Sequence, residues 1–70
     1  DTRRKLDRVR QLLAEKGPPA SEVVNLRAQG YSYAEIAARL QISENSARVM
    51  EHRTRNWLKS TLQKEGLWND

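Results

Sequence analysis

The amino-acid sequence predicts an all-α fold, a four-helix domain with a helix-turn-helix and a long C-terminal helix. Three observations lead to this prediction. Apolar residues recur at helical spacing along the 70 residues, glycines and prolines stand between the periodic segments, and a serine that can cap a helix precedes each of the last two segments. The expected helices span residues 3–16, 19–29, 33–40 and 44–64.

The first expected helix is basic and amphipathic, and it ends before Gly17 and two prolines, which cannot continue a helix. Its apolar stripe consists of Leu6, Val9, Leu12 and Leu13. Such a helix can pack on the domain through its leucines, lie on DNA or bind a protein, but it lacks the aromatics of a membrane-surface helix. We therefore expect residues 1–16 to be a linker or the first helix, and residues 17–70 to form the helix-turn-helix domain.

The second and third helices have clear start and stop signals. The second is expected to stop at Gly30 in a left-handed conformation. Its inward-facing residues are expected to be Val23, Val24 and Leu26. Ser32 and Glu35 fit a capping box, in which the hydroxyl and the carboxylate each bond a backbone N–H left open at the helix start. The apolar pattern stops at residues 41–43, and Ser43 is a good N-cap for the last helix.

The last helix can be sorted into two faces at about 100° per residue. The expected buried face consists of Ala47, Met50, Thr54, Trp57, Leu58 and Thr61, with Leu62 at its edge. The opposite face consists of Asn45, Arg48, Val49, His52, Asn56 and Lys59. Its Asn, Arg and His stand near the helix start, the part that enters the major groove when such a helix docks on DNA. Arg can bond a guanine edge twice and Asn an adenine edge. The alternative is a polar surface that contacts nothing.

The few aromatic residues are expected to belong to the core, because the chain has no Phe. Burial of Trp57, and of Trp68 in the tail, would remove a large area from water. Tyr31 and Tyr33 are interpreted as core and helix-staple residues, since rings stack on bases mainly on sheets and in single-strand grooves. After Gly66 the apolar tail either folds back on the last helix or forms an exposed hook for a partner.

Composition limits the function classes. The net charge is +4 and the sequence pI is about 10.0, which favours a polyanionic partner because neutralised phosphates release counterions. With no Cys, one His and no Gly-rich phosphate loop, we expect neither an enzyme nor a bound metal or cofactor. Short apolar runs and the lack of a signal peptide predict a cytoplasmic protein without a membrane partner. A start at Asp1 instead of Met predicts a piece of a longer chain.

Several motifs together resemble the fourth region of bacterial sigma factors, most of all the extracytoplasmic-function group. The motifs are EVVNLR at 22–27, GYSYAEIA at 30–37, LQIS at 40–43 and SAR at 46–48. The resemblance covers about residues 18 to 60. The same motifs occur in weaker form in LuxR/GerE-type regulator domains.

The resemblance implies a four-helix domain that reads the promoter element near −35, docks on core RNA polymerase and can be sequestered by an anti-sigma factor. Carried over position by position, it places base contacts on Asn45, Arg48, Val49 and His52. Phosphate contacts are expected on Ser32, Tyr33, Ser43, Arg53, Arg55 and Lys59, of which Arg53 and Arg55 match the R-A-R segment of the family. The angular sort of the last helix reaches the four base-contact residues independently.

The chain departs from the family pattern at three places. Gln41 stands where the family prefers Gly in the turn, and Ser46-Ala47 replaces the usual Thr-Val. Glu51 stands where Leu is common, which puts an acid at the edge of the buried face. It is expected to pair with Arg48 or Arg55 at helical spacing, a contact worth about 0.2–0.5 kcal/mol.

Three functions from different classes follow. The first is sigma-type promoter recognition by a monomeric domain. The second is a LuxR/GerE-type regulator, which would normally dimerise and bind a palindrome. The third is a helix-turn-helix used mainly to bind a protein, such as an anti-sigma factor or the polymerase. Trp57, Leu58 and Leu62 are expected to be needed for the domain's own core, which argues against dimerisation through the last helix.

Overall fold

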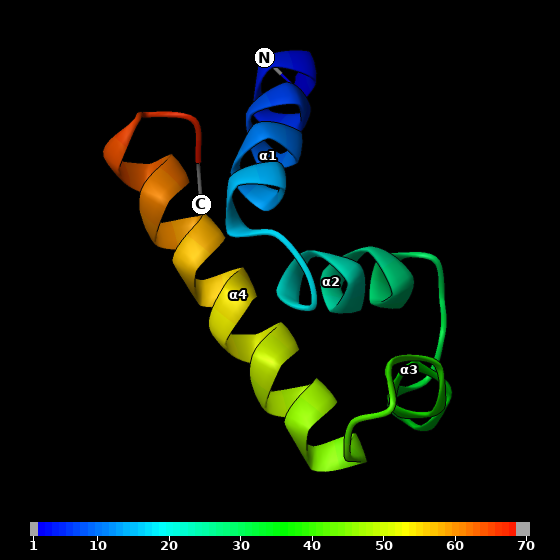
Figure 1. The fold of residues 1–70 in the computed structure, drawn as a ribbon. Coiled ribbons are helices and arrows are strands. Elements are labelled where there is room, and N and C mark those ends of the chain that lie inside the picture. The colour runs from blue at the N-terminus through cyan, green and yellow to red at the C-terminus, as the bar shows by residue number, and fades with distance from the viewer. Residues whose placement is uncertain (1, 69–70) are drawn as a thin grey trace.

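The computed structural model describes residues 2–68, and this part of the chain consists of four helices without a strand. They are α1 (Thr2–Lys16), α2 (Ala20–Ala28), α3 (Tyr33–Leu40) and α4 (Glu44–Lys64). The predicted all-α class and the helix bounds are confirmed to within one residue. Helix α4 is the central element of the domain and packs against the other three helices. Helix α3 lies at its N-terminal end, α2 beside its middle and α1 beside its C-terminal half (Figure 1).

The predicted caps of α3 and α4 are present. The Ser32 hydroxyl accepts a hydrogen bond from the Glu35 backbone N–H at 3.1 Å, and the Glu35 carboxylate accepts one from the Ser32 N–H at 3.1 Å. Hydrogen bonding of the Glu35 carboxylate to Ser32, first with its backbone N–H and then with its side chain, holds the pKa of Glu35 below its usual range. At the start of α4 the Ser43 hydroxyl accepts from the Ser46 N–H at 2.9 Å. The starts of α3 and α4 are therefore both fixed by local hydrogen bonds.

The turn itself contains a residue in a left-handed conformation. Gln41 ends α3 with φ 57° and ψ 45°, a region that glycine enters easily and residues with a side chain enter at a cost of about 1–2 kcal/mol. The Ile42 N–H then donates to the Ala37 carbonyl at 3.1 Å. Gln41 thus takes a backbone conformation for which glycine is better suited. The predicted left-handed stop at Gly30 is confirmed, with φ 98°.

Two hydrophobic clusters hold α4 in place. The helix-turn-helix cluster consists of Val23, Ile36 and Ala47, all completely buried. The clasp cluster consists of Leu12, Leu13, Leu58 and Leu62. The first joins α2, α3 and the start of α4, and the second joins α1 to the end of α4. Val24 and Leu26, both predicted to face inward with Val23, are half-buried against these clusters.

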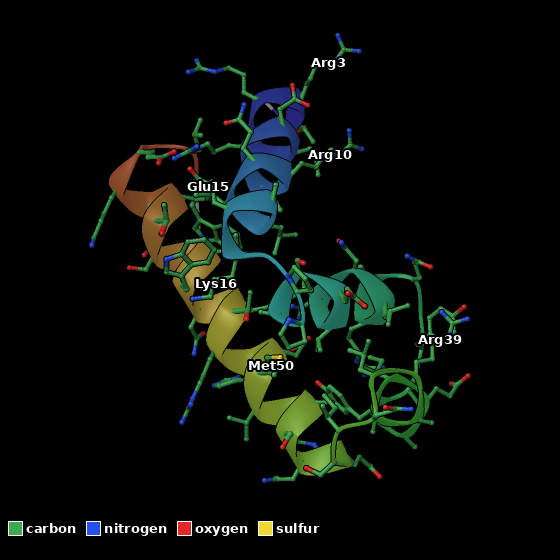
Figure 2. The ribbon with its side chains drawn as sticks, viewed as in Figure 1. Arg3, Arg10, Glu15, Lys16, Arg39 and Met50 are labelled. Atoms are coloured by element: carbon green, nitrogen blue, oxygen red, sulfur yellow. The ribbon has the colours of Figure 1, made fainter. Side chains whose placement is uncertain are left out.

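Helix α1 packs through its predicted apolar stripe, with one correction. Its two buried leucines belong to the clasp cluster and Val9 is half-buried, but Leu6 is 53% exposed. Arg8 fastens the first half of α1 to the end of α4, because its Nε and Nη2 atoms each lie 2.8 Å from a carboxylate oxygen of Glu65. These hydrogen bonds hold the pKa of Glu65 below its usual range. Arg3 and Arg10 project from the opposite side of α1 (Figure 2).

The described part of the tail folds back, as one of the two alternatives predicted. Gly66 has φ 73°, and the Leu67 N–H donates to the Leu62 carbonyl at 2.8 Å. Leu67 and Trp68 then pack on the clasp cluster, and the Lys5 ammonium lies 3.9 Å from the centre of the Trp68 ring.

The buried face of α4 is rotated from the predicted one. Its buried residues are Ala47, Glu51, Thr54, Leu58 and Leu62. Leu62 is therefore central instead of marginal, and Trp57 is only half-buried although it was predicted to be in the core. The rotation arises because α1 and the tail cover the far end of α4 from the Leu62 side. A single helical wheel contains no information about these neighbours.

Candidate nucleic-acid interface

The four residues predicted to contact bases share one exposed face of α4. Asn45, Arg48, Val49 and His52 are all exposed, while Ala47 on the opposite side is completely buried. Ser43 caps this helix, and its hydrogen bond fixes where α4 begins after the connecting turn. The four side chains therefore project from a helix whose other side is anchored in the core. A recognition helix has this arrangement when it lies in the major groove of DNA, with one face toward the bases and the other in the core of the domain.

Arg48 is held in place by two neighbours. Its Nη2 atom lies 3.4 Å from a carboxylate oxygen of Glu44, one turn earlier on α4. Its guanidinium carbon lies 5.0 Å from the centre of the Tyr33 ring, which begins α3. Tyr33 is itself half-buried against the helix-turn-helix cluster, and Arg27 lies on its ring at 4.6 Å. With its side chain 53% exposed, Arg48 is both oriented and accessible. Cation–π contacts of this kind contribute about 0.5–1 kcal/mol at exposed sites.

The residues predicted to contact phosphates come from two places. Ser32, Tyr33 and Ser43 lie at the starts of α3 and α4, where helix N-termini point backbone N–H groups outward. Arg53, Arg55 and Lys59 are exposed farther along α4. The set is spread out, since Lys59 lies roughly 21 Å from Asn45 along the helix at 1.5 Å per residue. Such spacing suits contacts with a DNA phosphate backbone that runs alongside α4.

Glu51 is buried and forms the predicted ion pair with Arg55. Its side chain is 7% exposed, and one carboxylate oxygen lies 3.3 Å from the Nε atom of Arg55. Of the two arginines that the sequence left open as partners, the structure pairs Arg55 with this acid and Arg48 with Glu44. The acid therefore lies in the buried face and not at its edge. The pair leaves the Arg55 side chain 67% exposed.

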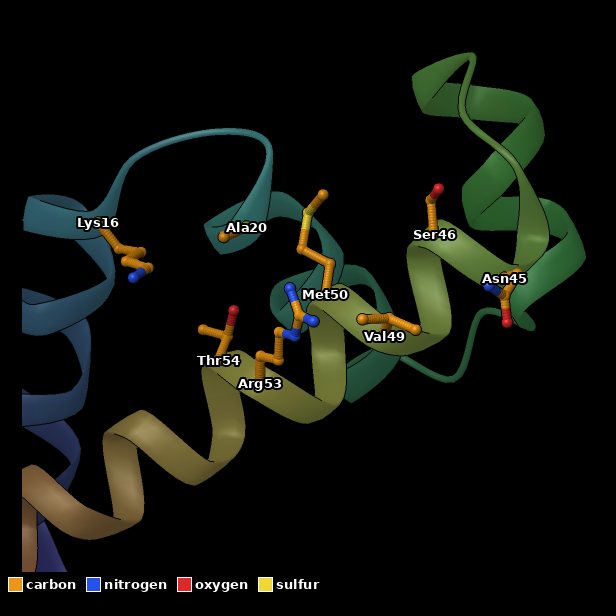
Figure 3. A pocket seen from close by; sticks show the side chains of 8 residues that line it. All are labelled: Lys16, Ala20, Asn45, Ser46, Val49, Met50, Arg53 and Thr54. Carbon is orange, nitrogen blue, oxygen red and sulfur yellow. The ribbon is translucent and has the colours of Figure 1, made fainter.

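An open groove of about 430 Å³ separates the α1–α2 corner from α4 (Figure 3). It is lined by Lys16, Ala20, Asn45, Ser46, Val49, Met50, Arg53 and Thr54. Lys16 comes from the end of α1 and faces the α4 side of the groove, where Arg53 lies. Nothing in the sequence pattern linked Lys16 to α4, because the two segments meet only in the fold.

The described residues contain no group of His, Asp or Glu side chains that could hold a metal ion. Within residues 2–68 there is also no helix whose length and hydropathy would let it cross a membrane.

Comparison with known families decides what this helix-turn-helix is. Residues 6–58 match the family model described as sigma-70, region 4. The chain belongs to this family. Region 4 is a non-enzymatic DNA-binding helix-turn-helix of transcription initiation, and membership implies binding to the promoter −35 element and association with RNA polymerase. The match begins in α1 and ends at Leu58 in the clasp cluster. Neither the curated proteins nor the solved structures contain a match to this chain.

Proposed function

We propose that this chain is the C-terminal, promoter-reading domain of a sigma factor of the extracytoplasmic-function type. It binds double-stranded DNA sequence-specifically at the −35 element and so directs RNA polymerase to its promoters. One observation carries this proposal. Asn45, Arg48, Val49 and His52 form an exposed face on α4, directly opposite buried residues. A helix used only for packing or solvation would have no need of this combination of side chains.

The bases are read by the first three turns of α4 in the major groove. Arg48 offers a planar guanidinium that matches the two acceptors of guanine, and the Asn45 amide matches the donor and acceptor of adenine. His52 lies one turn beyond Arg48 on the same face and reaches the next base pairs. Because Tyr33 and Glu44 already orient Arg48, less conformational entropy is lost when it binds.

The phosphates fix the position of α4 in the groove. Ser32, Tyr33 and Ser43 contact the backbone on one side through the starts of α3 and α4. Arg53, Arg55 and Lys59 contact it on the other. Between residues 48 and 59 there are four Arg or Lys side chains and a single acid, which is buried in an ion pair. The exposed charge of this segment is therefore strongly positive, as counterion release from DNA requires.

The domain acts in the cytoplasm as a monomer bound to core RNA polymerase, and an anti-sigma factor is a further partner that can sequester it. We assign α1 to the domain as its first helix, since Leu12 and Leu13 are buried together with Leu58 and Leu62 of α4. Leu58 and Leu62 are therefore buried inside the domain, which argues against their use in dimerisation.

The test is a selection from a randomised duplex of about 20 base pairs, two helical turns of DNA. It is run with the parent chain and with Arg48→Glu as the control. We expect the parent to enrich a short asymmetric motif and the control to enrich none. A palindrome would contradict the sigma assignment in favour of a LuxR/GerE-type regulator. No enrichment by either protein would favour a module that binds mainly other proteins.

A further inference from the structure

Val49 is unusual among the residues of the reading face. Only two large hydrophobic side chains are exposed among the described residues, Leu6 at 53% and Val49 at 37%. A single exposed aliphatic side chain is ordinary on a protein surface. The position of this one is informative, because Val49 directly follows Arg48 and lies one turn before His52 on the face proposed to read bases.

Val49 also belongs to a shallow hollow of about 350 Å³ with mostly apolar walls. The hollow is lined by Tyr33, Arg48, Val49, Glu51, His52 and Arg53. Two arginines stand at it, while the charge of the one acid is directed toward Arg55. An apolar surface flanked by cations fits an apolar group carried by a polyanion. In DNA that description fits one chemical group in the major groove, the C5-methyl of thymine.

We propose that Val49 and this hollow read the methyl group of a thymine next to the base pair that Arg48 contacts. The inference rests on the proposed function and adds one named base to it. Aliphatic side chains recognise thymine by covering its methyl group, which no other natural base presents. Neighbouring residues of a reading helix reach neighbouring base pairs. A thymine at this position is therefore preferred over cytosine, which presents no methyl group to cover.

The experiment removes one methyl group at a time from the selected duplex. Each thymine is replaced in turn by deoxyuridine, which pairs identically and lacks only the methyl. We expect one replacement, within about two base pairs of the position that Arg48 controls, to weaken binding about 4-fold, the factor that corresponds to burying one CH₂ or methyl group. The other replacements should leave the affinity unchanged. Val49→Ala should bind the thymine and deoxyuridine duplexes equally.

Leu6→Ala is the matched control. It truncates the other exposed aliphatic side chain, at a site on α1, and should keep the 4-fold ratio between the two duplexes. Suppose that every deoxyuridine duplex binds as tightly as the thymine duplex, while Arg48→Ala still relaxes the selected motif. Thymine reading is then wrong, but base reading by α4 stands. A ratio that survives in Val49→Ala also overturns the inference, because another residue then contacts the methyl. If the chain selects no motif at all, the proposed function itself fails.

Discussion

The two hydrophobic clusters hold the same helix, but they are built differently. The helix-turn-helix cluster has only three fully buried residues, and one of them is the small Ala47, which lets α3 and α4 approach closely. Capped helix ends and arginines stacked on Tyr31 and Tyr33 surround it. The clasp cluster uses four leucines, two half-buried tryptophans and the Arg8–Glu65 ion pair. The first cluster therefore sets the angle of the α4 face that we propose reads bases, and the second anchors the rest of α4.

The largest expected effects come from emptying each cluster. Ile36 and Leu62 are both completely buried, so Ile36→Ala and Leu62→Ala should each lower the free energy of unfolding by about 2–5 kcal/mol in urea titrations. Their effects on DNA should differ. At low temperature, where the variants remain folded, Leu62→Ala should keep the parent's ratio of affinity for selected over random duplex, whereas Ile36→Ala should lower it. Equal ratios in the two variants would contradict the division of roles between the clusters.

A smaller loss of stability is expected at Trp57, which lies on the clasp cluster without being inside it. The ring is half-buried, and the Lys16 ammonium lies 4.9 Å from its centre. Full burial of a Trp would make truncation cost about 3–5 kcal/mol, so we expect Trp57→Ala to cost about 2 kcal/mol in urea unfolding. A cost of about 3–5 kcal/mol would show that the ring is a core residue, as the sequence predicted.

Two substitutions that act on the local structure of the helix-turn-helix should have smaller effects on the free energy of unfolding. One should lower it and the other should raise it. Ser32→Ala removes the N-cap of α3 and should cost about 1 kcal/mol. Gln41→Gly should raise the free energy of unfolding by about 0.5–1 kcal/mol, because glycine relieves the left-handed conformation at φ 57°. Thermal melts of both variants check the signs. A destabilised Gln41→Gly would mean that the Gln41 side chain contributes more than its backbone costs.

The smallest expected effect is a shared dependence on acid. The pKa values of Glu35 and Glu65 are lowered in the folded chain, by the hydrogen bonds with Ser32 and with Arg8 respectively. Each carboxylate therefore stabilises the fold above its ordinary pKa, and this contribution is lost as the pH falls through the lowered value. Glu35→Gln keeps a capping-box side chain, and Glu65→Gln keeps the size of its residue, so each should flatten the loss of stability between neutral pH and about pH 3. Unchanged profiles would contradict these two contacts.

Much of the fold could be predicted because its signals are local. The capping box at Ser32, the cap at Ser43 and the stop at Gly30 depend on residues within one turn of each other, and all three are present. The exposed positions of Arg48 and His52 also follow from helical spacing alone. Such features need no knowledge of the neighbouring helices.

The remaining features could not be predicted because they depend on neighbours distant in sequence. Glu51 is buried and Trp57 is half-exposed since α1, α2 and the tail decide which side of α4 is covered. The stack of Tyr33 on Arg48 joins α3 to α4, and the groove that contains Lys16 joins α1 to α4. A wheel drawn for one helix contains none of these contacts.

The most direct test of the central claim, that the exposed face of α4 reads bases, compares Arg48→Ala with Lys59→Ala. Both remove one exposed cation from α4. Binding of the selected duplex and of a random duplex is measured at two salt concentrations. We predict that Arg48→Ala weakens the selected duplex alone, by about 1–3 kcal/mol, while Lys59→Ala weakens both duplexes alike and reduces the salt dependence. Equal losses on both duplexes for both variants would contradict base reading by Arg48.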